Sequence, residues 1–250
     1  MAGGAALVGW LKAVFIVLGT LMVATLIYTI AIDGLPFRIE LLTPWMAATL
    51  VDYYINVVPL AAWVSYKETN WVARVVWIIL LVCLGSVTTC GYITLQLFKL
   101  STEESTHDPM SHLLLQDQNK NGIDHKNNGL RLTTARVAFS VLGFIMLGTL
   151  VYTITTDGSP FRKELLTPWL TATLVDFYIN VAALSVWVVY KESRWFGKVA
   201  WIAGLICFGS IVTSVYVAYQ FFQLSAFDPL YLVLLNSKQR AESRYEKASG

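Results

Sequence analysis

The sequence predicts an all-α integral membrane protein with six transmembrane helices, arranged as two inverted repeats of three helices each. The composition is that of a membrane protein, because 56% of the 250 residues are hydrophobic and only 14% are charged. Soluble domains carry about 25% charged residues. The apolar stretches are long enough to cross a bilayer, and the chain repeats itself.

The repeat becomes visible when the chain is shifted by 124 residues, so that Asp33 falls on Asp157. Between residues 33–68 and 157–192, 26 of 36 positions are identical. Such self-similarity indicates a tandem duplication. The predicted divisions are repeat one (1–100), a polar linker (101–135), repeat two (136–235) and a polar C-terminal tail (236–250).

Each repeat contains three apolar segments of membrane-spanning length, since about 20 residues of helix cross about 30 Å of hydrocarbon. Thr43-Pro44 is typical of a helix start, with an N-cap followed by proline at the first helical position. The predicted helices are 13–32, 43–66 and 71–98 in repeat one and 136–156, 167–190 and 195–223 in repeat two. A further short helix on the membrane surface is predicted at 109–115, with its match at 229–235.

An odd number of crossings in each repeat leads to the predicted inversion. If three helices cross, the second repeat enters from the opposite side, and a pseudo-two-fold axis lies in the membrane plane, as in many secondary transporters. With six crossings the basic residues divide nine against nine. The positive-inside rule then leaves open which side faces the cytosol.

The strongest functional signal is a polar stripe inside the second helix of each repeat, in TLVDYYINV (49–57) and TLVDFYINV (173–181). An ionised Asp at the bilayer centre costs about 2.5–3.5 kcal/mol on insertion scales, so it requires partners. Ser and Thr of the third helices are the expected hydrogen-bond donors, and two Asp brought together by the pseudo-two-fold axis would share one proton. The candidate binding residues are Thr49, Asp52, Asn56, Ser86, Thr173, Asp176, Asn180 and Ser210.

Three interpretations of this stripe remain open. The first is a site for a proton or a small cation in a small transporter or channel-like protein. The second is interhelical hydrogen bonding in a non-catalytic scaffold or assembly factor, at about 0.6 kcal/mol per bond. The third is a polar contact in a lipid-phase enzyme or lipid-binding protein. Gly85-Ser86 and Gly209-Ser210 are interpreted as small residues that let helices approach closely.

Several classes are disfavoured by what the sequence lacks. Its three histidines, His107, His112 and His125, all lie in the linker, which argues against haem and di-iron centres. No GxSxG, Walker A or GxGxxG motif occurs, and the net charge of +2 does not suggest nucleic acid. Residues 117–128 resemble an EF-hand loop, but Asn128 replaces its final Glu, and a flexible linker is the favoured interpretation. We therefore expect no enzyme activity, no cofactor and no metal site.

The repeated signature PFR-x-ELLTPW … TLVD(Y/F)YINV … W-V-x-YKE resembles a plant family catalogued as Domain of Unknown Function 1475. The resemblance covers nearly the whole chain outside the linker. It implies a multipass membrane protein and carries over no activity, ligand or catalytic residue. The expected surroundings are the lipid bilayer of the endomembrane system or plasma membrane, with a proton or small cation as partner.

Overall fold

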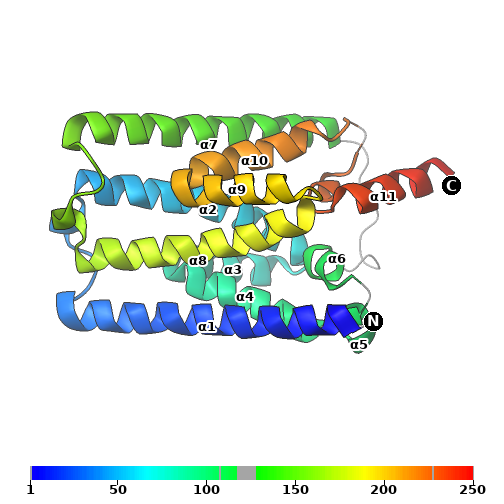
Figure 1. The fold of residues 1–250 in the computed structure, drawn as a ribbon, viewed down its shortest axis with the longest axis horizontal. Coiled ribbons are helices and arrows are strands. Elements are labelled where there is room, and N and C mark those ends of the chain that lie inside the picture. Colours follow the sequence, from blue (N-terminus) through cyan, green and yellow to red (C-terminus); the bar gives the residue numbers. More distant parts are fainter. Residues whose placement is uncertain (1, 107, 117–127, 227, 250) are drawn as a thin grey trace.

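Four long helices lie side by side and give the molecule its length (Figure 1). The structure, a computed structural model, describes residues 2–106, 108–116, 128–226 and 228–249, and its regular elements there are all helical. The long helices are α1 (Ala2–Asp33), α2 (Pro44–Lys67), α7 (Asn128–Asp157) and α8 (Pro168–Lys191). Each is long and apolar enough to cross a membrane, which supports the predicted membrane class.

The ends of α2 and α8 form as the sequence predicts. The hydroxyl oxygens of Thr43 and Thr167 accept hydrogen bonds from the backbone N–H groups of Met46 and Leu170, each at 3.2 Å. Short 3-10 helices, η1 (Ile39–Leu41) and η4 (Lys163–Leu165), precede these caps. We call this end of the molecule the loop end, and the end that holds both chain termini the terminal end (Figure 1).

The predicted third spanning helix of each repeat is wrong. Residues 71–98 form two antiparallel helices, α3 (Trp71–Leu84) and α4 (Ser86–Lys99), that turn back at Gly85. Two contacts show the reversal: the rings of Trp77 and Tyr92 are 5.0 Å apart, and the Thr88 hydroxyl donates to the Leu80 carbonyl at 2.9 Å. At 1.5 Å per residue, the 14 residues of α3 reach about 20 Å from the terminal end, short of a full crossing.

Repeat two has the same hairpin, formed by α9 (Trp195–Phe208) and α10 (Ser210–Phe222). The rings of Trp201 and Tyr216 lie 4.8 Å apart across it. The physical cause of both turns is a glycine backbone conformation, with φ of 55° at Gly85 and 53° at Gly209. Side-chain-bearing residues rarely adopt this region, so a pair of apolar half-helices replaces one long helix.

The inverted arrangement is also wrong. Because each repeat consists of two long helices and a hairpin that turns back, both repeats begin and end at the same end of the molecule. In Figure 1, α1 and α7 both start at the terminal end and run to the loop end. The pseudo-two-fold axis therefore runs along the helices, as between parallel repeats, and does not lie in the membrane plane.

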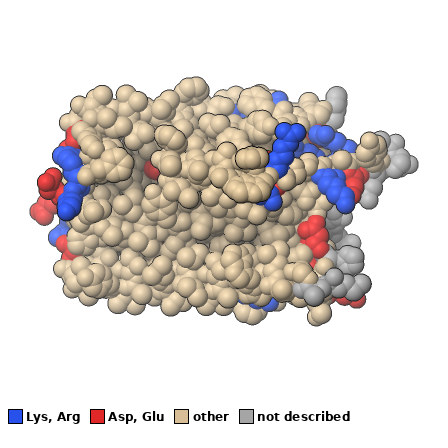
Figure 2. Space-filling view, in the orientation of Figure 1, with Lys and Arg blue, Asp and Glu red and all other residues tan. Residues whose placement is uncertain are grey.

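The two repeats interlock through their hairpins. The second arm α4 packs against α1 of its own repeat and also against α8, while α10 packs against α7 and α2. The first arms lie outside, since Leu81 in α3 and Leu205 in α9 are their single buried residues. Figure 2 shows the result as a broad band nearly free of charged side chains between charged ends, the surface expected against lipid.

The basic residues are unevenly divided between the two ends, in contrast to the even division expected for six crossings. The loop end holds three, Arg38, Arg162 and Lys163, and the other described basic residues lie at or toward the terminal end. That larger set comprises Lys12, Lys67, Arg74, Lys99, Arg131, Arg136, Lys191, Arg194, Lys198, Lys238, Arg240 and Arg244.

The terminal end is closed by short elements. Short helices are present where they were predicted, as α6 (Pro109–Leu114) and the 3-10 helix η5 (Leu230–Val233), and their position at a membrane surface stays a prediction. They are joined there by α5 (Thr102–Thr106) and the polar helix α11 (Ser237–Ser249). The EF-hand-like stretch lies outside the described residues except for Asn128, which begins α7.

Candidate functional site

The tip of each hairpin is held by an aspartate from the opposite repeat. The backbone N–H of Ser86 donates to Oδ1 of Asp176 at 2.6 Å, and the backbone N–H of Ser210 donates to Oδ1 of Asp52 at 2.7 Å. The hydroxyls of Ser86 and Ser210 themselves have no hydrogen-bond partner among the described residues. The sequence names these serines as donors to the aspartates, but the donors are their backbone N–H groups and the structure joins them across the repeats.

Elementary helix chemistry explains this pairing. A half-helix that begins inside the membrane presents N–H groups that water cannot satisfy, and its N-terminus carries partial positive charge. A carboxylate accepts hydrogen bonds from these N–H groups and also offsets the partial positive charge. Its closeness to the turn leaves no space for a side chain there: a Cβ at Gly85 would lie 2.2 Å from Oδ2 of Asp176, and one at Gly209 would lie 2.5 Å from Oδ2 of Asp52.

The asparagines form a second layer one helical turn toward the terminal end. The hydroxyl of Thr89 donates to Oδ1 of Asn180 at 2.7 Å, and that of Thr213 donates to Oδ1 of Asn56 at 2.5 Å. Both asparagines are fully buried. Each hairpin is therefore fastened to the opposite repeat at two successive levels.

The predicted threonines of the stripe do not join the site by hydrogen bonding. The hydroxyl of Thr49 donates to the Trp45 carbonyl at 2.8 Å, and that of Thr173 donates to the Trp169 carbonyl at 2.9 Å, both within their own helices. Among the described residues no hydrogen bond joins Asp52 to Asp176. The expectation that the two acids share one proton therefore finds no support in the geometry.

The two sites differ at one residue. The Tyr53 hydroxyl hydrogen-bonds the Asp176 carboxyl. Its counterpart Phe177 has no hydroxyl to offer at the Asp52 site, although its ring also approaches the hairpin turn, with Cζ 2.8 Å from a Cβ built at Gly209. At both sites the asparagine nitrogen, Nδ2 of Asn56 and Nδ2 of Asn180, has no hydrogen-bond partner among the described residues.

Both carboxyl groups keep some access to the surroundings. Asp52 and Asp176 are half-buried, and no ion pair within the described part of the chain neutralises either of them. Figure 2 shows an acidic side chain at the bottom of a hollow in the middle of the band between the charged ends. Over the described residues, no group of three or more His, Cys, Asp and Glu is placed to hold a metal ion.

Sequence reasoning missed a second polar pair near the terminal end. Oε1 of Glu68 accepts hydrogen bonds from the Tyr92 hydroxyl at 2.8 Å and from Nε2 of Gln96 at 3.3 Å. Repeat two has the same cluster, in which Glu192 accepts from the Tyr216 hydroxyl at 3.0 Å and from the Gln220 amide at 3.4 Å. The duplicated YKE motif and the glutamines in matching places were the available signal. These clusters brace each hairpin against the end of the preceding helix.

Comparison with known proteins places the chain in a family without assigning an activity. No curated protein matches it, and no solved structure matches it. A family model described as "Protein of unknown function (DUF1475)" matches residues 1–241. Because that match covers nearly the full length, the chain belongs to the DUF1475 family.

Proposed function

We propose that the protein is a small proton- or cation-coupled transporter or channel-like protein in which Asp52 and Asp176 are the responsive groups. One observation carries this: an ionisable, half-buried carboxyl inside the membrane holds the N-terminus of a hairpin from the other repeat. The charge state of the acid and the position of the hairpin are thereby linked. No enzyme activity is part of this function.

The linkage follows from the hydrogen bonds. An ionised carboxylate is a strong acceptor at a helix N-terminus, whereas a protonated or cation-bound one is weaker. Neutralising Asp52 loosens the tip of α10, and neutralising Asp176 loosens the tip of α4. Non-helical backbone at membrane depth is otherwise found where it is buried in protein or lines a hydrated cavity, which is a setting suited to transport.

The uneven charge supports an orientation. Short loops rich in Lys and Arg stay in the cytosol. Only Arg38, Arg162 and Lys163 of the described basic residues lie at the loop end. We expect the terminal end to face the cytosol, and protease access to the C-terminal tail in sealed vesicles tests this. The predicted endomembrane or plasma-membrane location stays a prediction.

Flux through proteoliposomes tests the transport role. Wild-type protein should dissipate an imposed proton, sodium or potassium gradient, followed with a trapped dye, and the Asp52→Asn/Asp176→Asn variant should not. Thr49→Val and Thr173→Val are matched controls on the same helices, because those hydroxyls bond only to their own backbone. These controls should keep the wild-type flux.

A structural role is the second candidate, because each carboxyl accepts from the N-terminus of a hairpin arm in the opposite repeat and so ties the two repeats together. In that case the acids fasten the hairpins of a scaffold or assembly factor. Wild-type liposomes would then leak no faster than empty ones for any ion tested. The double Asn variant would only unfold at a lower temperature.

A further inference from the structure

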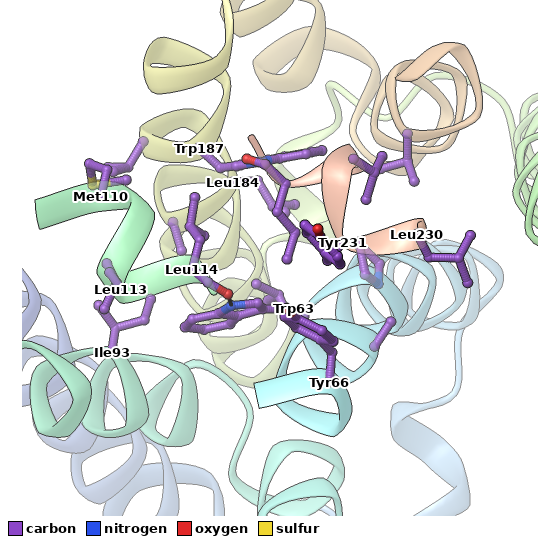
Figure 3. Close-up of a pocket in the computed structure, with 18 of the residues that line it drawn as sticks. Trp63, Tyr66, Ile93, Met110, Leu113, Leu114, Leu184, Trp187, Leu230 and Tyr231 are labelled. Atoms are coloured by element: carbon purple, nitrogen blue, oxygen red, sulfur yellow. Dashed lines mark hydrogen bonds between the residues drawn. The ribbon is translucent and has the colours of Figure 1, made fainter. Parts of the chain in front are cut away.

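An apolar cavity lies between the two repeats at the terminal end, away from the carboxyl sites (Figure 3). Its volume is about 280 Å³. The walls come from α2 and α8 in nearly symmetric pairs, Leu60 with Leu184 and Trp63 with Trp187. The roof is formed by α6, through Met110, Leu113 and Leu114, and by the segment around η5, through Leu230, Tyr231, Val233 and Leu234.

The indole N–H groups of the two tryptophans already donate hydrogen bonds to backbone carbonyls of the roof. The indole N–H of Trp63 donates to the Leu114 carbonyl at 3.2 Å, and that of Trp187 donates to the Leu234 carbonyl at 3.4 Å. No charged side chain is among the described residues that line the cavity. The lining therefore offers an occupant mainly aliphatic and aromatic carbon.

The lysines at the ends of α2 and α8 fasten the same roof from outside. The Lys67 ammonium donates to the His112 carbonyl at 2.7 Å and also to that of Leu115, while Lys191 donates to the Val233 carbonyl. The two parts of the roof, α6 and the segment around η5, differ in secondary structure. Each is nevertheless held by a tryptophan and a lysine in matching positions of its repeat. The repeated fastening maintains the space beneath instead of letting the short segments collapse into it.

An apolar cavity of this size is a favourable place for an apolar molecule. Empty apolar space lowers stability in proportion to its volume, and a cavity of about 150 Å³ binds benzene or xenon. The present one is roughly twice as large, enough for on the order of ten carbon atoms. A charged or strongly polar ligand would lose its hydration without replacement there.

We propose that this cavity is a binding site for a small uncharged hydrocarbon group of about ten carbon atoms. The group could be supplied by a free apolar molecule or by the end of a lipid acyl chain. The chemistry is shared, and the experiment separates the two sources. Neither source involves Asp52 or Asp176.

The test is photolabelling of the full chain in lipid nanodiscs with two probes. One is phenyl(trifluoromethyl)diazirine, a free apolar molecule, and the other is a phosphatidylcholine with a diazirine at its acyl end. Labelled residues are located by mass spectrometry with and without excess naphthalene. Ala62→Trp fills the cavity, because Ala62 lines it, and Ala47→Trp is the control on the exposed surface of the same helix.

The expected result is saturable labelling of Trp63, Trp187 or the roof, reduced at least five-fold by naphthalene and by Ala62→Trp but not by Ala47→Trp. Labelling by the free probe identifies a free molecule as the source, and labelling by the lipid probe alone identifies an acyl chain. Labelling that does not saturate and is equal in both variants would overturn the site. Should Ala62→Trp not yield monodisperse protein, Ala62→Phe serves in its place.

Discussion

The two hairpin sites have the same backbone and the same acid, amide and serine, yet they are not chemically equal. In the Asp176 site the Tyr53 hydroxyl hydrogen-bonds the carboxyl. In the Asp52 site Phe177 stands in its place and has no hydroxyl to offer, while the amide nitrogens of Asn56 and Asn180 both lack a partner among the described residues. The comparison teaches that duplication preserved the fastening of the hairpins, while one oxygen atom distinguishes the surroundings of the two carboxyls.

The largest loss of stability is expected when the glycine at either hairpin turn is replaced, because both sites depend on such a turn. Gly85→Ala and Gly209→Ala should each destabilise the protein by about 3 kcal/mol or more, because positive φ and a clash with the carboxyl combine. Gly85→Ala should be the worse, since its Cβ would meet both Asp176 and Tyr53 at 2.2 Å.

The measurement is the free energy of unfolding in detergent. Gly91→Ala in α4 is the matched control, because a Cβ there meets nothing within 4 Å and alanine favours helix. Equal stability of the Gly85→Ala and Gly91→Ala variants would contradict the turn geometry.

Replacing each aspartate by asparagine should show which of the two carboxyl sites contributes more to the stability of the protein. Asp176→Asn should cost about 2–3 kcal/mol, because bonds from the Ser86 N–H and the Tyr53 hydroxyl both lose an ionised acceptor. Asp52→Asn should cost less, about 1–2 kcal/mol, since that site lacks the tyrosine. Thermal unfolding of the two single variants, side by side, measures the difference. The opposite ranking would show that the tyrosine does not strengthen its site.

Exchanging the aromatic residues tests the single-atom difference directly. Tyr53→Phe should cost about 1 kcal/mol, because the Asp176 carboxyl loses the tyrosine hydroxyl as a donor. Phe177→Tyr should be neutral or stabilise by up to about 1 kcal/mol, by supplying a hydroxyl to Asp52. The double exchange should move the stronger carboxyl site from Asp176 to Asp52. Unfolding curves of all three variants decide it, and a strongly destabilised Phe177→Tyr protein would speak against space for the hydroxyl.

The smallest change in stability is expected at the turns that follow the hairpins. Asp108 and Asp228 occupy matching positions there. Asp228 accepts from the Ser225 N–H at 2.8 Å and pairs with Arg244 of α11, whereas Asp108 accepts from Gln239. Burial works to raise the pKa of Asp228, but Arg244 and the Ser225 N–H outweigh it and lower the pKa below its usual 3.8.

A lowered pKa in the folded protein means that the contact stabilises fully above about pH 4 and is lost as the pH falls further. Arg244→Ala should therefore loosen α11 at pH 7 by at most about 1 kcal/mol and make little difference near pH 2. Hydrogen exchange of residues 237–249 measures this. Equal exchange in wild type and variant at pH 7 would show that the ion pair does not hold the helix.

The sequence was a good guide to single helices and a poor one to topology. Helices predicted at 43–66 and 167–190 are found at Pro44–Lys67 and Pro168–Lys191, because threonine caps and proline mark their starts. The third helices were mispredicted since hydropathy is blind to a glycine turn between two apolar arms. A missing crossing then reversed the predicted relation between the repeats.

The candidate site was predicted only in part. Asp, Asn and Ser were selected because a buried acid needs donors, and they do meet, although the serines bind through their backbone N–H groups and Thr49 and Thr173 bond within their own helices. That Asp52 meets Ser210 and not Ser86 depends on the interlocking of the repeats, which no local pattern contains. The exchange of Tyr53 for Phe177 was visible in the alignment of the repeats, but its meaning required the position of the hydroxyl.

The hairpins that return to the end they came from also distribute the helices unevenly along the molecule. Among the described residues, the half toward the terminal end contains the four long helices and four hairpin arms, while the half toward the loop end contains the long helices alone. If the long helices cross a bilayer, one leaflet would therefore meet twice as many helical segments of this protein as the other.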